Sequence, residues 1–220
     1  FGGNVGVGGT LSVTGTSTLT GNIISPITLA GTTPTLTIGD AGAEDAKIVF
    51  DGNAQDYHIG LDDSADTLVI GKGSALGTTT SMSFDANGII NKPLQPSFSV
   101  YGADQSYSSN TPTVVEFPSE EFDINNDFNT TTDRFVAPVD GRYLFTGAIQ
   151  YSATGSAHIN FFKNGGSVTD GYLDFKDAGA SSSSRIFNLS ANDYIQLILY
   201  HSASGTTSGQ RTRMSGFLIG

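Results

Sequence analysis

The protein has 220 residues with no cysteine and 28 glycines, and its 21 acidic and ten basic residues give a formal net charge of −11. The excess of acidic over basic residues argues against a nucleic-acid partner, because phosphate binding depends on clustered Lys and Arg. The lack of cysteine excludes disulfides, thiolate metal sites and a cysteine nucleophile. No apolar run approaches the length of a membrane span, so we expect no membrane insertion. Because the sequence starts at Phe1 without Met or a signal peptide, we expect it to be part of a longer or processed polypeptide.

Residues 1–39 contain no charged side chain and follow a six-residue repeat. The repeat places Gly3, Gly9, Gly15 and Gly21 at equal intervals and spaces Val7, Val13 and Leu19 in the same way. A short fixed period indicates a β-helical or β-spiral shaft, and alternating apolar and hydroxyl residues are typical of strands. One such strand has too little apolar surface to offset its ordering entropy, so several copies are expected to pack together. A flexible linker rich in Gly, Ser and Thr is the alternative interpretation.

Residues 40–95 predict a small β module or a second shaft segment. Short apolar runs alternate with acidic or glycine-containing turns, which indicates strands at residues 47–51, 57–61, 67–71 and 81–85. Two prolines, Pro93 and Pro96, then mark a boundary.

Residues 96–220 hold the main hydrophobic core, because 18 of the 22 Phe and Tyr residues lie there. The pattern predicts no amphipathic helix, and many short strands favour a sandwich or jelly roll. The predicted strands are residues 97–101, 113–117, 134–138, 141–151, 157–163, 172–175, 185–189, 193–201 and 212–218.

Several of these strands resemble one known family. The matching stretches are residues 96–100, 128–129, 134–145, 159–165, 189–197 and 215–219. Together they are similar to the globular head of the complement C1q family, part of the C1q/tumour-necrosis-factor-like superfamily, although Asn192 stands where that family usually has Gly. The resemblance implies a ten-stranded jelly roll that assembles as a homotrimer, recognises ligands through exposed loops and has no catalytic activity.

The segments before the head resemble shaft segments of bacteriophage fibres, many of which end in a trimeric receptor-binding head. Animal chains of the C1q family carry a collagen stalk instead, and this sequence has no Gly-X-Y run. A three-chain shaft and a trimeric head share one symmetry axis, so the two resemblances are consistent with each other.

The sequence predicts no enzyme. His58, His158 and His201 are the available bases, but no nucleophile elbow, zinc-protease motif or dinucleotide-binding loop accompanies them. A depolymerase would need paired carboxylates. The dense acidic group of Glu116, Glu120, Glu121 and Asp123 is interpreted as a solvated loop instead.

A calcium site is the one metal site that the sequence suggests. Asp170, Asp174 and Asp177 lie between two predicted strands, where some C1q-like heads place the acidic residues of a calcium site near the trimer apex. Clustered oxygen ligands suit Ca²⁺, and three symmetry copies would gather carboxylates that repel one another without a cation. A plain acidic loop is the alternative, and no cofactor is required.

Receptor contacts are expected in two small polar loops, residues 178–184 and 202–210, since recognition residues concentrate in loops. Tyr107 and Tyr172 neighbour loop segments and could stack on a sugar face. Ser202 and Gln210 are further candidates within the second loop.

The sequence thus predicts an all-β homotrimer with a repetitive shaft (residues 1–39), a small β module (residues 40–95) and a C1q-like jelly-roll head (residues 96–220). Its expected role is that of a phage tail fibre on the virion, attached through an upstream segment, whose head adsorbs to a bacterial surface glycan or protein. A structural capsid or neck fibre and a tailspike depolymerase are the alternatives.

Overall fold

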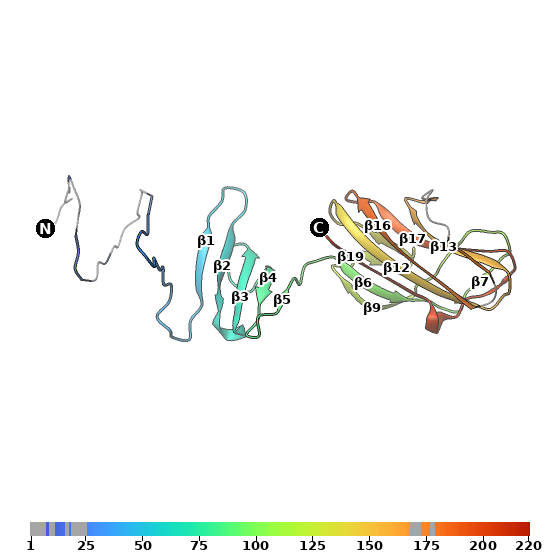
Figure 1. The fold of residues 1–220 in the computed structure, drawn as a ribbon, viewed down its shortest axis with the longest axis horizontal. Coiled ribbons are helices and arrows are strands. Elements are labelled where there is room, and N and C mark those ends of the chain that lie inside the picture. Colours follow the sequence, from blue (N-terminus) through green and yellow to red (C-terminus); the bar gives the residue numbers. More distant parts are fainter. Residues whose placement is uncertain (1–7, 9–11, 16–17, 19–25, 168–172, 177–178) are drawn as a thin grey trace. The chain divides into compact units, whose positions relative to one another are not determined.

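The computed structural model describes residues 8, 12–15, 18, 26–167, 173–176 and 179–220 (Figure 1). The chain divides into the units Phe1–Asp40 and Ala41–Gly220. In the first unit, residues 26–40 form no strand, and aliphatic side chains such as Ile27 and Leu36 are exposed. Most of the six-residue repeat lies outside the described residues. No helix within the described ranges is long and apolar enough to span a membrane.

The first sheet is an antiparallel meander in which neighbouring strands are also neighbours in sequence. Its strands are β1 (Ala46–Phe50), β2 (Tyr57–Asp62), β3 (Thr67–Lys72), β4 (Thr80–Phe84) and β5 (Ile90–Asn91). The four predicted strands of this segment are confirmed to within a residue or so at each end. Between β2 and β3, the Asp62 carboxylate accepts a hydrogen bond from the Ala65 N–H (3.2 Å) and caps the short 3-10 helix Asp63–Ala65, which forms the predicted acidic turn.

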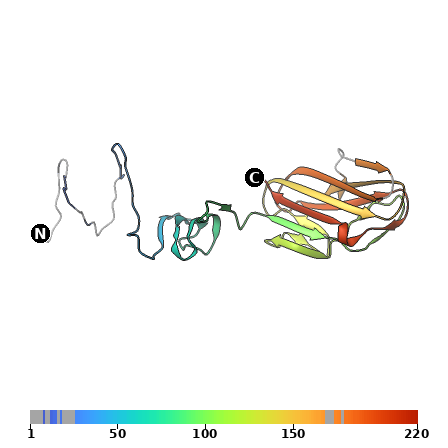
Figure 2. The ribbon, with the colours of Figure 1, turned by 60° about the horizontal axis from the view of Figure 1, so that its bottom comes forward.

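The head is a two-sheet jelly roll (Figures 1 and 2). One sheet has the order β16-β12-β19-β6-β9, and the other has the order β10-β11-β17-β13-β14, with β15 added to β13 and β8 to β17. A short pair, β7 and β18, completes the strands. The first sheet consists of β6 (Ser97–Tyr101), β9 (Ser119–Ile124), β12 (Gly141–Tyr151), β16 (Gly179–Leu189) and β19 (Arg213–Leu218). The remaining head elements are β7 (Ser106–Tyr107), β8 (Thr113–Val114), β10 (Phe128–Asn129), β11 (Arg134–Val136), β13 (Ser156–Lys163), β14 (Gly166–Ser167), β15 (Leu173–Lys176), β17 (Tyr194–His201), β18 (Gly205–Thr206) and the 3-10 helix η2 (Gly209–Arg211).

An aromatic cluster fills the space between the two sheets. Phe98 stacks on Phe128 and Phe135 with ring centroids 5.0 and 5.1 Å apart, and Phe145 meets Phe135 edge-on at 5.3 Å. These side chains are fully or almost fully buried. Along β12, buried residues alternate with more exposed ones, so one face of the strand builds the core and the other forms the outer surface.

Two expectations for the head were wrong. Residues 179–184, predicted as a loop, form the first half of β16, whose eleven residues all pair with β12. Glu120, Glu121 and Asp123, interpreted as a solvated loop, lie in β9, which pairs with β6 at the edge of its sheet. Glu120 and Glu121 are exposed, and charges on an edge strand discourage pairing with other chains. Asp123 is half-buried and accepts hydrogen bonds from the Asp127 and Phe128 N–H groups.

The turn before β17 explains the asparagine at position 192. Asn192 has φ +72°, a left-handed conformation that glycine adopts without cost and that asparagine tolerates better than other residues. Its N–H donates to the Ala137 carbonyl at 2.8 Å. We expect Asn192→Ala to lower the free energy of unfolding by about 1 kcal/mol and Asn192→Gly to leave it unchanged or raise it, as measured by urea titration. Equal losses in both variants would contradict this explanation.

Candidate interaction surface

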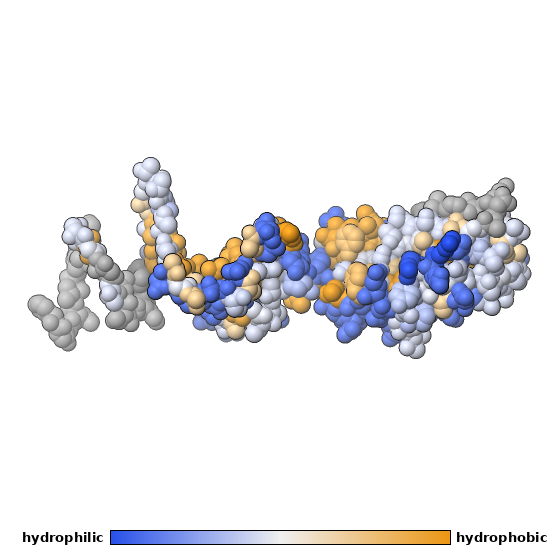
Figure 3. All heavy atoms as spheres, turned by 90° about the horizontal axis from the view of Figure 1, so that it is seen from below, coloured by the Kyte–Doolittle hydropathy of each residue, from blue (hydrophilic) through white to orange (hydrophobic). Residues whose placement is uncertain are grey.

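The outer face of the sheet β16-β12-β19-β6-β9 carries an exposed apolar strip. The register places Ile186, Leu144 and Phe217 side by side, and Ile186 is 57% and Phe217 46% exposed. Phe122 of β9 adds to the strip, and a groove of about 190 Å³ runs between Phe122, Leu144 and Phe217. Figure 3 shows hydrophobic surface on the head. Adjacent exposed apolar side chains of this kind indicate a protein contact surface.

The same face becomes polar farther along the strands. The Thr146 and Ser215 hydroxyls form a hydrogen bond at 2.8 Å, and the Ser99 hydroxyl donates to the Glu121 carboxylate at 2.9 Å. One row beyond, the Arg213 guanidinium lies 4.9 Å from the centre of the Tyr101 ring. The face therefore combines an apolar end with an end that can hydrogen-bond.

Arg213 borders two open depressions at the polar end. One, of about 430 Å³, is lined by Thr146, Gly147, Ala148, Ser182, Ser183, Ser184 and Arg213. The other, of about 610 Å³, is lined by Tyr101, Glu120, Glu121, Gln210 and Arg213. An aromatic ring, two carboxylates, an amide and a guanidinium offer both donors and acceptors to a polar ligand such as a sugar.

The structure places the predicted receptor residues in different environments. Gln210 lies in η2 and is exposed, at the edge of the larger depression. Ser202 is also exposed, and its hydroxyl oxygen accepts the Ser156 N–H at 3.0 Å. Tyr172 lies outside the described residues. Sequence reasoning missed Tyr101 and Arg213, whose proximity depends on the pairing of β6 with β19.

Tyr107 is a correction to the sequence analysis. Its side chain is only 6% exposed and belongs to the core, with its ring centroid 5.4 Å from that of His201. A ring enclosed in this way does not present a face to a sugar.

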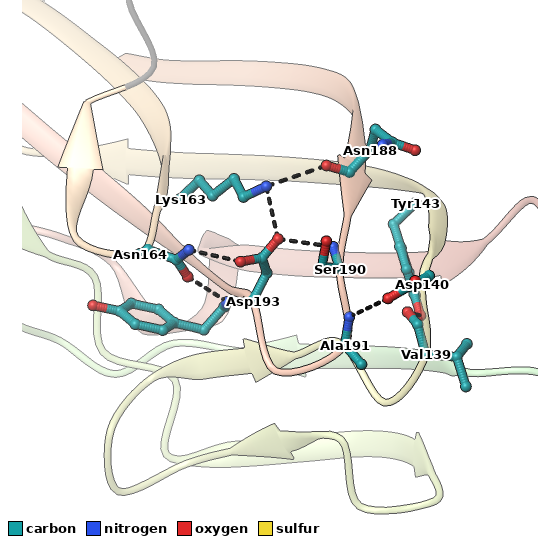
Figure 4. Close-up of polar contacts among 10 residues, drawn as sticks. Val139, Asp140, Tyr143, Lys163, Asn164, Asn188, Ser190, Ala191 and Asp193 are labelled. Atoms are coloured by element: carbon teal, nitrogen blue, oxygen red, sulfur yellow. Dashed lines mark hydrogen bonds and ion pairs between the residues drawn. The ribbon is translucent and has the colours of Figure 1, made fainter.

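A polar network holds together the turns at one end of the jelly roll (Figure 4). The Asp193 carboxylate accepts hydrogen bonds from Lys163 (2.7 Å), Asn164 (2.7 Å) and the Ser190 N–H (2.8 Å). These contacts, first among them the one from Lys163, lower the pKa of Asp193 to about 2. Nearby, the Asp140 carboxylate accepts the Ala191 N–H, which ties the turn before β12 to the turn before β17. The network has a structural role, because each carboxylate is used in fixing a turn.

Sequence comparison identifies the jelly roll. The family model of the C1q domain matches residues 97–219, more than half of the chain. The chain belongs to the C1q domain family. No curated protein matches the sequence.

Solved structures similar to the chain cover a little more than half of it. The globular domain of the zebrafish complement 1qA protein shares 19% identity with a TM-score of 0.44, over 57% of this chain and 98% of that one. The crystal structure of murine APRIL at pH 8.5 shares 13% identity with a TM-score of 0.46, over 57% of this chain and 99% of that one.

The predicted calcium ligands of the C1q domain fall mostly on residues that the structure does not describe. Asp170 and Asp177 are outside those residues, and for Asp174 only the backbone is described, which pairs with His158 between β15 and β13. Among the described residues, no group of three or more His, Asp and Glu side chains could hold a metal ion. The calcium site stays a prediction.

The three histidines take part in packing. His58 and His201 are each 1% exposed, with the Nδ1 of His201 accepting the Ala203 N–H at 2.9 Å. His158 stacks on Tyr200 with ring centroids 4.6 Å apart. Each histidine therefore has a structural explanation.

Asp127 gives the C1q domain a pH-dependent stability. Burial, followed by repulsion from Asp123, raises the pKa of Asp127 to about 6, and its Oδ2 is buried without a hydrogen bond from the described residues. Between the ordinary value of 3.8 and about 6, the folded state keeps a proton that the unfolded state releases. The free energy of unfolding therefore falls as pH rises through this range.

We expect Asp127→Asn to raise the urea midpoint at pH 7 and to change it little at pH 4, because asparagine keeps the shape of the protonated acid. Glu120→Gln, which removes a charge from the exposed face of β9, serves as the control and should show no such difference. The same shift for Asp127→Asn at both pH values would contradict the titration of this group.

Proposed function

We propose that the chain is a homotrimeric fibre protein of a bacteriophage tail, whose C1q head binds a glycan or protein on the bacterial surface. C1q-type domains are trimeric receptor-binding modules rather than enzymes. The observation that carries the proposal is the apolar strip of Ile186, Leu144 and Phe217 on one sheet of the head, in which a single chain leaves Ile186 and Phe217 exposed and Leu144 half-buried. Burying it between copies removes this surface from water.

The N-terminal residues support a fibre over an animal complement protein. The six-residue repeat has no Gly-X-Y pattern, and exposed aliphatic residues such as Ile27 and Leu36 need neighbouring chains to be buried. In the proposed fibre, residues 1–39 of three chains wind together into a shaft. Several heads on one virion then multiply weak contacts, which supplies avidity without catalysis.

Receptor contact is proposed for the polar end of the head surface, with Gln210 and the neighbouring Tyr101 and Arg213 as the residues to test first. Tyr101 offers a ring face, while Gln210 and Arg213 offer hydrogen-bond donors, and this combination suits a saccharide. Ser202 and Tyr172 remain loop candidates.

Solution mass and cell binding test the proposal together. Light scattering of the full chain should give about three times 22.9 kDa at all practical dilutions, and fluorescently labelled trimer should bind some members of a panel of bacterial strains in flow cytometry. A monomer would overturn the fibre. A trimer that binds no strain would favour a structural capsid or neck role, and saccharide released from the cells would favour a depolymerase.

We further propose that the trimer binds calcium through Asp170, Asp174 and Asp177. We expect millimolar calcium to raise the melting temperature relative to a chelator, because a cation relieves repulsion among the symmetry-related carboxylates. Asp174→Asn should remove the difference. Identical melting curves of the parent protein in calcium and in chelator would refute the site.

A further inference from the structure

One face of the β1–β5 sheet is apolar across all its strands. Residues paired between neighbouring strands share a face, and Ile48 pairs with Ile59, Ile59 with Ile70, and Ile70 with Met82. This middle row is flanked by a row of Ala46, Leu61, Leu68, Phe84 and Ile90 and by a row of Phe50, Tyr57 and Lys72. Lys72, at the end of its row, is the single charged residue of the three rows.

The opposite face of this sheet is covered by the chain itself. The loop between β3 and β4 folds against it, where the Lys47 ammonium donates to the Ser74 carbonyl at 2.7 Å and His58 Nδ1 lies 2.8 Å from the Gly73 carbonyl oxygen. His58 and Val69 are consequently buried. By contrast, Phe50 is 59% and Tyr57 52% exposed on the apolar face, which Figure 3 shows as hydrophobic surface on this module.

The size of the apolar face limits what can cover it. Two half-exposed aromatic rings and several half-exposed aliphatic side chains lie next to one another on this face, and a contiguous apolar patch of this kind indicates a contact surface. However, five strands about 4.8 Å apart and about 17 Å long give a projected face of only ~320 Å². This is well below the ~800 Å² per partner of a stable independent interface. The occupant must therefore already be held close by.

We infer that this face packs against the same face of the other copies of the chain, as a second interface of the proposed trimer. The inference rests on the proposed function, because a face of this size is too small to hold chains together by itself. The trimeric C1q heads bring the three copies of the face close to one another. Tethering by the heads turns the second contact into an intramolecular one with a high effective concentration.

The dimensions of the sheet suit three copies. Three such sheets can surround a threefold axis with their strands perpendicular to it. In cross-section they form an equilateral triangle whose sides are as long as the strands. Strands of about 17–20 Å place each sheet about 5–6 Å from the axis, which is half of the ~10 Å at which sheets pack face to face. The middle row of Ile48, Ile59, Ile70 and Met82 then lies at the axis, and Lys72 lies at a corner, where its ammonium reaches water.

A thiol-protection experiment on the full chain tests this interface, because the sequence contains no cysteine. Ile70 of the apolar face and Val49 of the covered face are both 37% exposed in the single chain, so Ile70→Cys and Val49→Cys form a matched pair. In the purified trimer, we expect N-ethylmaleimide to modify Ile70→Cys at least about tenfold more slowly than Val49→Cys, since a buried thiol reacts only during local opening. Ile48→Cys, in the same row, repeats the test if Ile70→Cys does not fold.

Light scattering on the same samples separates the outcomes. Trimers with equal modification rates would overturn this interface and leave the trimeric head standing, whereas monomers with equal rates would overturn both. Adding Ile186→Asp to the cysteine variants tells whether the apolar face is covered by another chain or by residues 1–40 of the same chain. Protection that persists in monomers of these double variants would assign the cover to the chain itself and overturn the inference.

Discussion

Replacing Phe145 with alanine should cost the head about 3–5 kcal/mol of unfolding free energy. Phe145 is fully buried in β12, and its ring centroid lies 5.3 Å from that of Phe135, 5.9 Å from that of Phe187 and 6.0 Å from that of Phe161. It therefore links aromatic residues of both sheets, and its removal leaves a cavity that the surrounding strands cannot close. A loss of this size approaches the whole stability of an ordinary domain.

Urea titration monitored by circular dichroism measures this loss. Val136→Ala provides the control, because Val136 is 37% exposed on β11, and it should change the unfolding free energy by less than about 1 kcal/mol. Similar midpoints for the two variants would mean that the aromatic cluster does not form the core of the head.

Ile186→Asp should convert the proposed trimer into monomers and lower the measured mass threefold. Ile186 is 57% exposed in the single chain, so a carboxylate at this position leaves the fold intact. In the trimer it would place three negative charges in an apolar contact, and burying an unpaired ion costs several kcal/mol. The mass is measured by light scattering, with circular dichroism to confirm that the strands persist.

Val136→Asp is the matched control for the association experiment. It introduces the same charge at an exposed β-branched residue on the other sheet of the jelly roll, and it should remain trimeric. If Ile186→Asp remained trimeric as well, the apolar strip would not be the contact between the heads. Monomers of both variants would point to a general effect of added charge.

Strands with strict alternation were predictable from the sequence. The predicted strand at residues 141–151 coincides with β12, because each inward apolar residue is followed by a residue that tolerates the surface. The same alternation located β6 and β19 to within a residue. The apolar runs of β13 and β17 were also located to within a residue, although β17 is buried along nearly its whole length rather than on one face. In these segments, local pattern and burial indicate the same structure.

The Ser-rich half of β16 could not be predicted in this way. Residues 181–184 are all serine, which has no strand preference of its own. They form a strand because β12 offers an unbroken row of backbone partners as far as Tyr151, so Ser181–Ser184 pair with residues 146–149. Tertiary pairing therefore outweighs local propensity.

The candidate site was predictable only in part. The sequence placed Gln210 in an exposed loop, and the structure brings it to the depression beside Arg213 and Tyr101. These residues come together because β19 pairs with β6 across more than one hundred intervening positions, which no local pattern reports. Tyr107 failed as a prediction for the same reason, since its burial depends on β17 and His201.

The order of strands also sets when the head can fold. β19 lies between β6 and β12, so the earliest strand of the head pairs with the latest, as in the pairing of Ser97 with Phe217. Such distant pairings fold slowly, and on the ribosome they cannot begin before residues 213–218 have emerged. The sheet that bears the apolar strip is therefore completed only after residues 213–218 have been synthesised. In the proposed trimer, the heads can therefore associate only after this last strand has joined the sheet.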